Sequence, residues 1–191
     1  AEMWRRLPIS PYIVQCYNAR EIDGAYTLLL EWCGGATLTH WVKKRRGAKG
    51  SPYQRKVALF MMHILLALRT IQGSNGMPFQ HGFTADDVML SEGCFSAKLG
   101  GFASVHKNFS GYPDDMSPQQ LSAENLFCWA RCFCYMLTGV EELADGSAGV
   151  DSSIIESRES WRCDLPDRVI KLLRQCLDRE EVLDVDDAVS V

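Results

Sequence analysis

Two long apolar segments of this 191-residue chain constrain its fold more than any other feature. In residues 53–71, apolar side chains recur at steps of three and four, which predicts a helix with one buried face. In residues 123–137, apolar side chains lie on more than one face, which predicts a helix buried nearly all round and closed by Gly139. We therefore expect a mostly helical body organised around these two helices.

Short apolar runs near the N-terminus predict a β-hairpin beside that body. Residues 13–17 and 26–32 are the two apolar runs. Between them lies Asp23-Gly24, a dipeptide that favours the positive φ angles of a tight turn. Thr37 follows as the expected N-cap of a short helix that ends at Lys44.

Further elements complete an expected α+β fold that is mainly α. Residues 88–90 and 95–99 predict a second hairpin around Glu92-Gly93. Residues 167–178 predict a final amphipathic helix. The stretches expected to be loops are residues 104–119 and 144–159.

Composition restricts the classes of function. Hydrophobic residues make up 47% and charged residues 23% of the chain, as in an ordinary soluble globular protein. The net charge of -4 gives no reason to expect nucleic acid as the main partner. One basic run, which favours a solvated helix end over an anion-binding patch, comprises Lys43, Lys44, Arg45, Arg46 and Lys49.

The eight cysteines contain no Cys-x-x-Cys pair, so we expect reduced thiols rather than zinc ligands or disulfides. That use of cysteine favours a reducing intracellular compartment, with the cytoplasm as the default. No apolar stretch reaches the roughly 18 residues of a membrane span. The chain begins at Ala1 rather than at methionine, from which we expect a processed or trimmed polypeptide.

Residues 79–90, read together with residues 98–103, have the spacing of a protein kinase catalytic core. A kinase catalytic loop reads His-Arg-Asp-x-x-x-x-Asn, and its metal-binding turn reads Asp-Phe-Gly. The order of the expected elements also resembles a protein kinase over nearly the whole chain. The positions of the base, the phosphate-contacting lysine, the loop asparagine and the metal aspartate hold, in that order, Phe83, Ala85, Val88 and Gly101.

The resemblance implies a degenerate kinase that consists mostly of the C-terminal lobe. Residues 1–32 are similar to a remnant of the N-terminal lobe, with the end of its regulatory helix and its fourth and fifth strands. Residues 33–191 are similar to the helical C-terminal lobe. The family's glycine-rich loop and strand lysine have no counterpart, so the resemblance implies no roof over nucleotide phosphates.

The resemblance also implies where a nucleotide would sit, if one binds. Leu30 would be the gatekeeper, and Glu31 and Cys33 would be the hinge residues whose backbone reaches adenine. Leu90 would lie beneath the adenine. The family's stacked hydrophobic residues fall on Cys16, His81 and Phe102.

The remaining acids do not replace the lost catalytic groups. Asp86 and Asp87 are expected to be solvated turn carboxylates or to make an N-cap-like contact. Gln119 and Asp184 stand where the family carries a glutamate–arginine ion pair. Asn125 replaces a buried aspartate, and we expect it to accept one hydrogen bond.

The sequence thus predicts a pseudokinase, with no cofactor and no metal, that serves as a protein-binding scaffold or as a structural subunit of a larger assembly. Residues 12–32 are the expected contact surface for a protein partner or for the missing N-terminal lobe. One alternative is a nucleotide-binding allosteric module without phosphotransfer. The others are an atypical active Ser/Thr kinase and a nucleic-acid-binding role for the basic run.

Overall fold

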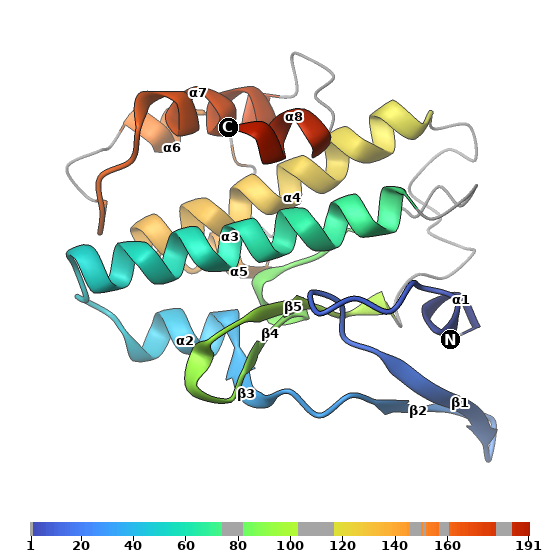
Figure 1. Ribbon diagram of the computed structural model, residues 1–191. Helices are drawn as coiled ribbons and strands as arrows, with labels where there is room; N and C mark the ends of the chain where they lie inside the picture. Colours follow the sequence, from blue (N-terminus) through green and yellow to red (C-terminus); the bar gives the residue numbers. More distant parts are fainter. Residues whose placement is uncertain are drawn as a thin grey trace.

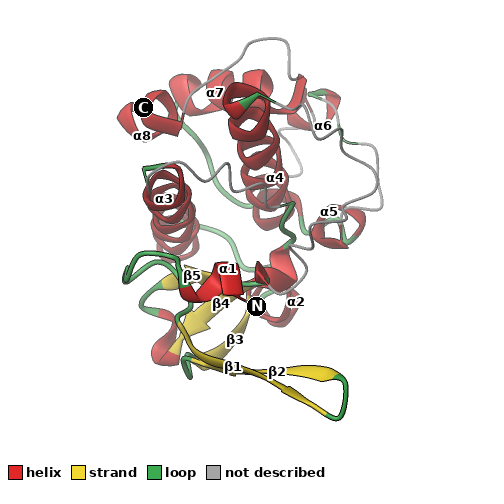
Figure 2. Ribbon diagram, turned by 90° about the vertical axis from the view of Figure 1, so that its right-hand side faces the viewer, coloured by secondary structure: helices red, strands yellow, loops and turns green. Residues whose placement is uncertain are grey.

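The computed structural model describes residues 2–73, 82–102, 117–145, 150, 152–156, 161–178 and 185–191 (Figure 1). Within these residues the chain is an α+β structure, mainly helical, with two small antiparallel sheets. The long helices α3 (Ser51–Gln72) and α4 (Pro118–Thr138) pack against each other and form the centre of the body. Figures 1 and 2 show the C-terminal helices on one side of this pair and both sheets on the other.

Helix α3 confirms the prediction for residues 53–71 and extends it slightly at both ends. Pro52 lies in its first turn, where a missing N–H costs nothing. The helix ends at Gly73, whose N–H donates to the carbonyl of Arg69 at 3.0 Å. Its buried face is the periodic apolar stripe of the sequence: Tyr53, Val57, Phe60, Met61, Ile64, Leu65, Ala67, Leu68 and Ile71.

Helix α4 begins five residues earlier than predicted. A capping box starts it: Ser117 Oγ accepts from the Gln120 N–H at 3.2 Å, and Gln120 Oε1 accepts from the Ser117 N–H at 2.7 Å. The loop prediction was therefore wrong for Pro118 and for Gln119, which lies exposed in the first helical turn. The helix closes as predicted at Gly139, which has a φ of 76°.

The first hairpin consists of β1 (Cys16–Ile22) and β2 (Ala25–Leu30). Asp23 and Gly24 have φ angles of 52° and 77°, which confirms the predicted tight turn. The strand predicted over residues 13–17 was wrong in its position. Ile13 instead bridges Leu99, because the backbone of residues 12–14 bonds to the end of the other sheet.

The second sheet has the order β3-β4-β5, formed by Gly34–Thr37, Val88–Ser91 and Ala97–Leu99. Strands β4 and β5 confirm the second predicted hairpin. Strand β5 starts later than expected because the short 3₁₀ turn η2 (Glu92–Cys94) precedes it, with Gly93 at a φ of 69°. Strand β3 was not predicted. It approaches β4 so closely that a Cβ on Gly35 would lie 2.2 Å from the carbonyl oxygen of Leu90.

The remaining helices are short, apart from α7. Helix α2 begins at its predicted N-cap, where Thr37 Oγ1 accepts from the His40 N–H at 3.3 Å. Helices α2 and α7 confirm the predicted bounds, and α6 corrects the expectation that residues 144–159 form only a loop. The set is α1 (Glu2–Arg5), α2 (Leu38–Lys44), η1 (Ala85–Asp87), α5 (Glu142–Asp145), α6 (Ser153–Glu156), α7 (Asp167–Asp178) and α8 (Val185–Ser190).

All eight cysteines are free thiols, and five of them are buried. Burial raises the pKa of the Cys134 and Cys176 thiols to about 12, so these side chains behave as small apolar groups. In the described parts of the chain, no three His, Cys, Asp or Glu side chains gather where they could hold a metal ion. Nor does any helix described there have the length and apolar character to cross a membrane.

Candidate functional site

Three of the four positions that match the kinase spacing lie in the core of the protein. Phe83, Ala85 and Val88 are each 0% exposed. Phe83 precedes the η1 turn, Ala85 begins that turn and Val88 begins β4. Val88 is paired with Leu99 across the β4–β5 ladder. The three side chains are therefore packing groups, and none presents a polar atom to solvent.

The η1 turn is held by a local carboxylate contact. Asp87 Oδ2 accepts hydrogen bonds from the Thr84 N–H at 2.9 Å and from the Thr84 hydroxyl at 3.0 Å. The Asp87 N–H returns a bond to the Thr84 carbonyl at 3.1 Å. This geometry confirms the predicted N-cap-like contact for Asp87. Asp86 is exposed, and its Oδ1 accepts from the Thr37 hydroxyl at 3.3 Å.

Gly101 lies directly against Asp87. A Cβ built on Gly101 would fall 2.0 Å from Asp87 Oδ1 and 2.4 Å from Asp87 Cγ. Gly101 also has a φ of 75°, a conformation that only glycine adopts readily. The Gly100 N–H donates to the Asp87 carbonyl at 2.8 Å. The structure thus brings the loop and the turn together, and the Asp87 carboxylate occupies the space that a side chain on residue 101 would need.

Arg131, which belongs to no motif found in the sequence, binds the backbone of the loop. It extends from α4, is only 8% exposed, and donates from Nη2 to the Phe83 carbonyl at 2.8 Å. The hydrogen bond expected at Asn125 is not found, because its buried Oδ1 has no hydrogen-bond partner among the described residues. Arg131, rather than Asn125, therefore provides the observed hydrogen bond from α4 to the loop backbone, and it does so as a donor.

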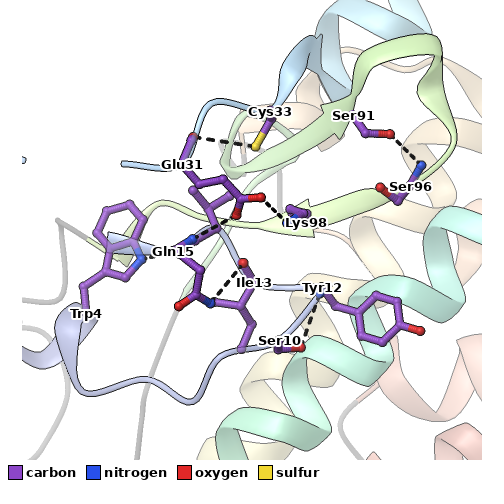
Figure 3. Close-up of polar contacts among 11 residues, drawn as sticks. Trp4, Ser10, Tyr12, Ile13, Gln15, Glu31, Cys33, Ser91, Ser96 and Lys98 are labelled. Atoms are coloured by element: carbon purple, nitrogen blue, oxygen red, sulfur yellow. Dashed lines mark hydrogen bonds and ion pairs between the residues drawn. The ribbon is translucent and has the colours of Figure 1, made fainter. Parts of the chain in front are cut away.

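Glu31 joins the first hairpin to the rest of the molecule (Figure 3). Its carboxylate forms an ion pair with Lys98 of β5, and its Oε2 accepts from the Gln15 N–H at 3.3 Å. Its own N–H donates to the Gln15 carbonyl at 2.8 Å. Both the side chain and the backbone N–H of this predicted hinge residue are therefore engaged in protein contacts.

The other predicted nucleotide contacts lie close to the same junction. Leu30 and Cys33 are partly buried against the core, and Leu90 is completely buried. The Cys33 carbonyl accepts from the Glu92 N–H at 3.0 Å, so it already has a donor. Burial, together with the nearby Glu31 charge, raises the pKa of the Cys33 thiol. The structure brings these residues to one junction, and some of their hydrogen-bonding groups are already used there.

Phe102 is a packing residue as expected, with its ring 5.2 Å from the Trp4 ring in an edge-to-face contact. Trp4 also donates from Nε1 to the Val14 carbonyl at 2.7 Å, which ties α1 to the junction (Figure 3). Cys16 is only partly buried, against the edge of the core. The predictions for His81 and Asp184 lie outside the described residues.

The basic run lies at the end of α2, as predicted, and is partly neutralised there. Lys43 and Arg46 both form ion pairs with Glu141. The Arg45 guanidinium lies 4.8 Å from the centre of the Trp41 ring. Paired and stacked cations offer a weaker attraction to nucleic acid than an open basic stripe.

The first hairpin exposes apolar side chains. Leu29 is 61% exposed, and Trp32, which was predicted as the end of a strand, lies beyond β2 and is 89% exposed. Tyr17 and Ile22 are also exposed. Both ribbon views show this hairpin projecting away from the helices (Figures 1 and 2). A projecting apolar surface of this kind is typical of a contact site.

No protein-family model matches the chain, and no curated protein matches it either. The chemistry of its own residues is therefore the evidence for its function. That evidence comes from the degenerate loop with Gly101 and from the exposed hairpin.

Proposed function

We propose that this chain is a pseudokinase: a degenerate protein kinase homologue without phosphotransfer, which serves as a protein-binding scaffold or as a structural subunit of a larger assembly. One observation carries the proposal. The four positions with kinase spacing hold three fully buried apolar side chains, Phe83, Ala85 and Val88, and one glycine, Gly101, that is packed against a carboxylate. The proposal includes the division into residues 1–32 and 33–191.

Phosphoryl transfer requires groups that these positions do not supply. The acceptor hydroxyl needs a residue that orients it, and the transferring phosphoryl group needs nearby positive charge. Magnesium needs oxygen ligands, which valine and glycine side chains lack. Phe83 and Ala85 supply neither a base nor a cation. Loss at all four positions removes each of these contributions.

The polar residues that remain near the loop support a structural role. Asp87 caps the η1 turn, and Arg131 binds the loop backbone. The loop is thus held firmly without a reacting group in it. A rigid body that carries a projecting apolar hairpin is suited to binding another protein.

A phosphotransfer assay tests the proposal. The full chain is incubated with radiolabelled ATP, Mg²⁺ or Mn²⁺, and casein as the acceptor. We expect incorporation equal to that of Asp86→Asn and Asp87→Asn variants and of a blank without protein. Metal-dependent incorporation that either substitution abolishes would establish the atypical active Ser/Thr kinase instead.

The nucleotide-binding alternative is tested separately by a thermal-shift titration with ATP, with and without Mg²⁺. We expect no rise in the melting temperature, because the Glu31 N–H and the Cys33 carbonyl already have partners. A saturable rise without Mg²⁺ that a Leu90→Trp substitution removes would favour an allosteric nucleotide module. RNA binding with a steep salt dependence would instead favour the basic run.

A further inference from the structure

Three prolines of the chain directly follow a serine, in the dipeptides Ser10-Pro11, Ser51-Pro52 and Ser117-Pro118. Serine followed by proline is the acceptor sequence of proline-directed serine/threonine kinases, whose active sites take a ring where other substrates have an amide N–H. The structure places the three serines in different surroundings, and these surroundings decide which hydroxyl another kinase can reach.

Ser10 and Ser117 are held inside local structure. Ser10 is only 6% exposed, and its Oγ accepts from the Tyr12 N–H at 3.3 Å (Figure 3). Both the hydroxyl and the N–H of Ser117 belong to the capping box of α4, where they bond to Gln120. A kinase that bound either serine would first have to break these contacts.

Ser51 lies on an open part of the surface. It is the first residue of α3, and it is exposed together with Lys49, Gly50 and Pro52. A Cβ on Gly47 or on Gly50 would meet no atom within 4 Å, so the space beside these two glycines is open. The ring of Pro52 disfavours helical backbone at the residue before it, and helix ends fray. Ser51 can therefore adopt the extended backbone of a kinase substrate at little cost.

Arg55 lies one helical turn beyond Ser51 and points at its hydroxyl. Its Nε and Nη2 donate to Ser51 Oγ at 3.3 and 3.0 Å. Arg55 is itself exposed, so its side chain can move aside while the hydroxyl reacts and then return. A phosphate carries a charge of about −1.5 to −2, and its oxygens fit the forked N–H groups of a guanidinium. An acidic group four residues before an arginine is also the favourable order on a helix.

We propose that Ser51 is a phosphorylation site for a separate, proline-directed serine/threonine kinase, and that Arg55 binds the phosphate once it is formed. Ser51 Oγ attacks the γ-phosphorus of the ATP that the modifying kinase holds. The Oγ–P bond forms, the bond from the γ-phosphorus to the β–γ bridging oxygen breaks, and ADP leaves. The hydroxyl proton passes to the catalytic aspartate of the modifying kinase.

The modification would act as a charge switch on this face of the molecule. Lys49 and Arg55 are exposed and make the surface around Ser51 basic, and the first turn of α3 has no acidic residue. A phosphate there introduces the opposite charge. This inference goes beyond the proposed pseudokinase function and does not depend on it.

The test incubates the full chain with a purified cyclin-dependent kinase, which is proline-directed, and Mg²⁺-ATP. The intact mass should show a single added phosphate, and tandem mass spectrometry should place it on Ser51. Ser51→Ala and Pro52→Ala should each prevent the addition, whereas the matched variants Ser10→Ala and Ser117→Ala should retain it. A blank without the added kinase should show no phosphate.

Four results would overturn the proposed site. These are no incorporation, phosphate on Ser10 or Ser117 in place of Ser51, incorporation that survives Pro52→Ala, and phosphate on Ser51 in the blank. Phosphorylation of casein by the chain itself would refute the pseudokinase function and would leave the assignment of Ser51 unchanged.

A second measurement tests the role of Arg55. The second pKa of the Ser51 phosphate, followed by ³¹P NMR, should lie below the value of about 6 for a free phosphoserine, because the guanidinium stabilises the dianion. Arg55→Gln should raise this pKa, whereas Arg69→Gln, near the other end of α3, should leave it low. A merely structural role of Arg55 would change stability without moving the phosphate pKa. A pKa that Arg55→Gln leaves unchanged would overturn the assignment of the phosphate to Arg55.

Discussion

Replacing Gly101 by alanine tests whether the Asp87 carboxylate fills the space beside residue 101. Two costs add in this variant. A non-glycine residue at positive φ costs about 1–2 kcal/mol. The new Cβ would also lie 2.0 Å from Asp87 Oδ1, so the carboxylate must leave Thr84. Loss of such a cap costs about 0.5–2 kcal/mol. We therefore expect a loss of about 1.5–4 kcal/mol in the free energy of unfolding.

Gly24→Ala is the matched control. Gly24 has nearly the same positive φ, 77° against 75° for Gly101, and a Cβ there would meet no atom within 4 Å. It should therefore lose only the backbone component, about 1–2 kcal/mol. Urea titrations followed by tryptophan fluorescence measure the difference, and the midpoint for Gly101→Ala should fall by about 1–2 M.

A double-mutant cycle assigns the extra cost to Asp87. Asp87→Ala removes the two nearest contacts and leaves Asp87 Cβ at 2.8 Å, so it should relieve only part of the clash. We expect the Gly101→Ala/Asp87→Ala variant to lose about 1 kcal/mol less than the sum of the single changes. Equal losses for Gly101→Ala and Gly24→Ala, or a coupling of zero, would refute the conclusion that Asp87 occupies this position.

Three further predictions concern other parts of the structure. Burial lowers the pKa of His63, whose Nδ1 accepts from the Ala97 N–H at 3.1 Å. Its contribution to stability is therefore complete above the unfolded pKa of about 6.5 and falls as the pH drops below it. His63→Gln should therefore remove this pH dependence from the urea midpoint. His40→Gln, a change at an exposed histidine, is the control and should leave the pH dependence of the midpoint unchanged. Iodoacetamide added to the folded protein should alkylate the three partly buried cysteines and spare the five buried ones, as measured by mass spectrometry. In urea, all eight should react. Rapid alkylation of Cys134 in the folded protein would contradict its burial. Lys98→Met should destabilise the protein by about 1–2 kcal/mol, because it leaves the Glu31 carboxylate without its ion-pair partner. Adding Glu31→Gln removes that unpaired charge and should recover part of the loss. Thermal melts of the single and double variants measure the difference.

Local sequence rules predicted the elements whose signals are contained within them. The periodic face of α3, the tight turn at Asp23-Gly24 and the N-cap at Thr37 each depend on a few neighbouring residues. Where tertiary contacts decided the outcome, prediction failed. Residues 13–15 look like a strand, yet Val14 bonds to Leu99 at 2.9 Å, a pairing that depends on a segment more than 80 residues away.

The candidate site was predictable in its spacing but not in its contacts. The sequence indicated that Phe83, Ala85, Val88 and Gly101 lack catalytic groups. It did not indicate that the Asp87 carboxylate would lie against Gly101, because that contact joins two segments through the β4–β5 hairpin. Nor did it indicate that Arg131 would donate to the Phe83 carbonyl, because its position on α4 belongs to no motif.

The contacts made by the polar groups of the loop explain why no single substitution that introduces a kinase-type side chain should confer phosphotransfer. Asp87 faces the turn, where it is bound to Thr84, and Arg131 uses its charge to hold the Phe83 carbonyl. An aspartate at position 101 would have to displace the Asp87 carboxylate, and an acid at position 83 would have to enter a fully buried site. Each substitution would thus meet a packing or desolvation cost before it supplied any chemistry. Internal contacts hold the loop at these positions, and among the described residues the exposed apolar side chains of the projecting hairpin are better suited to contact another protein.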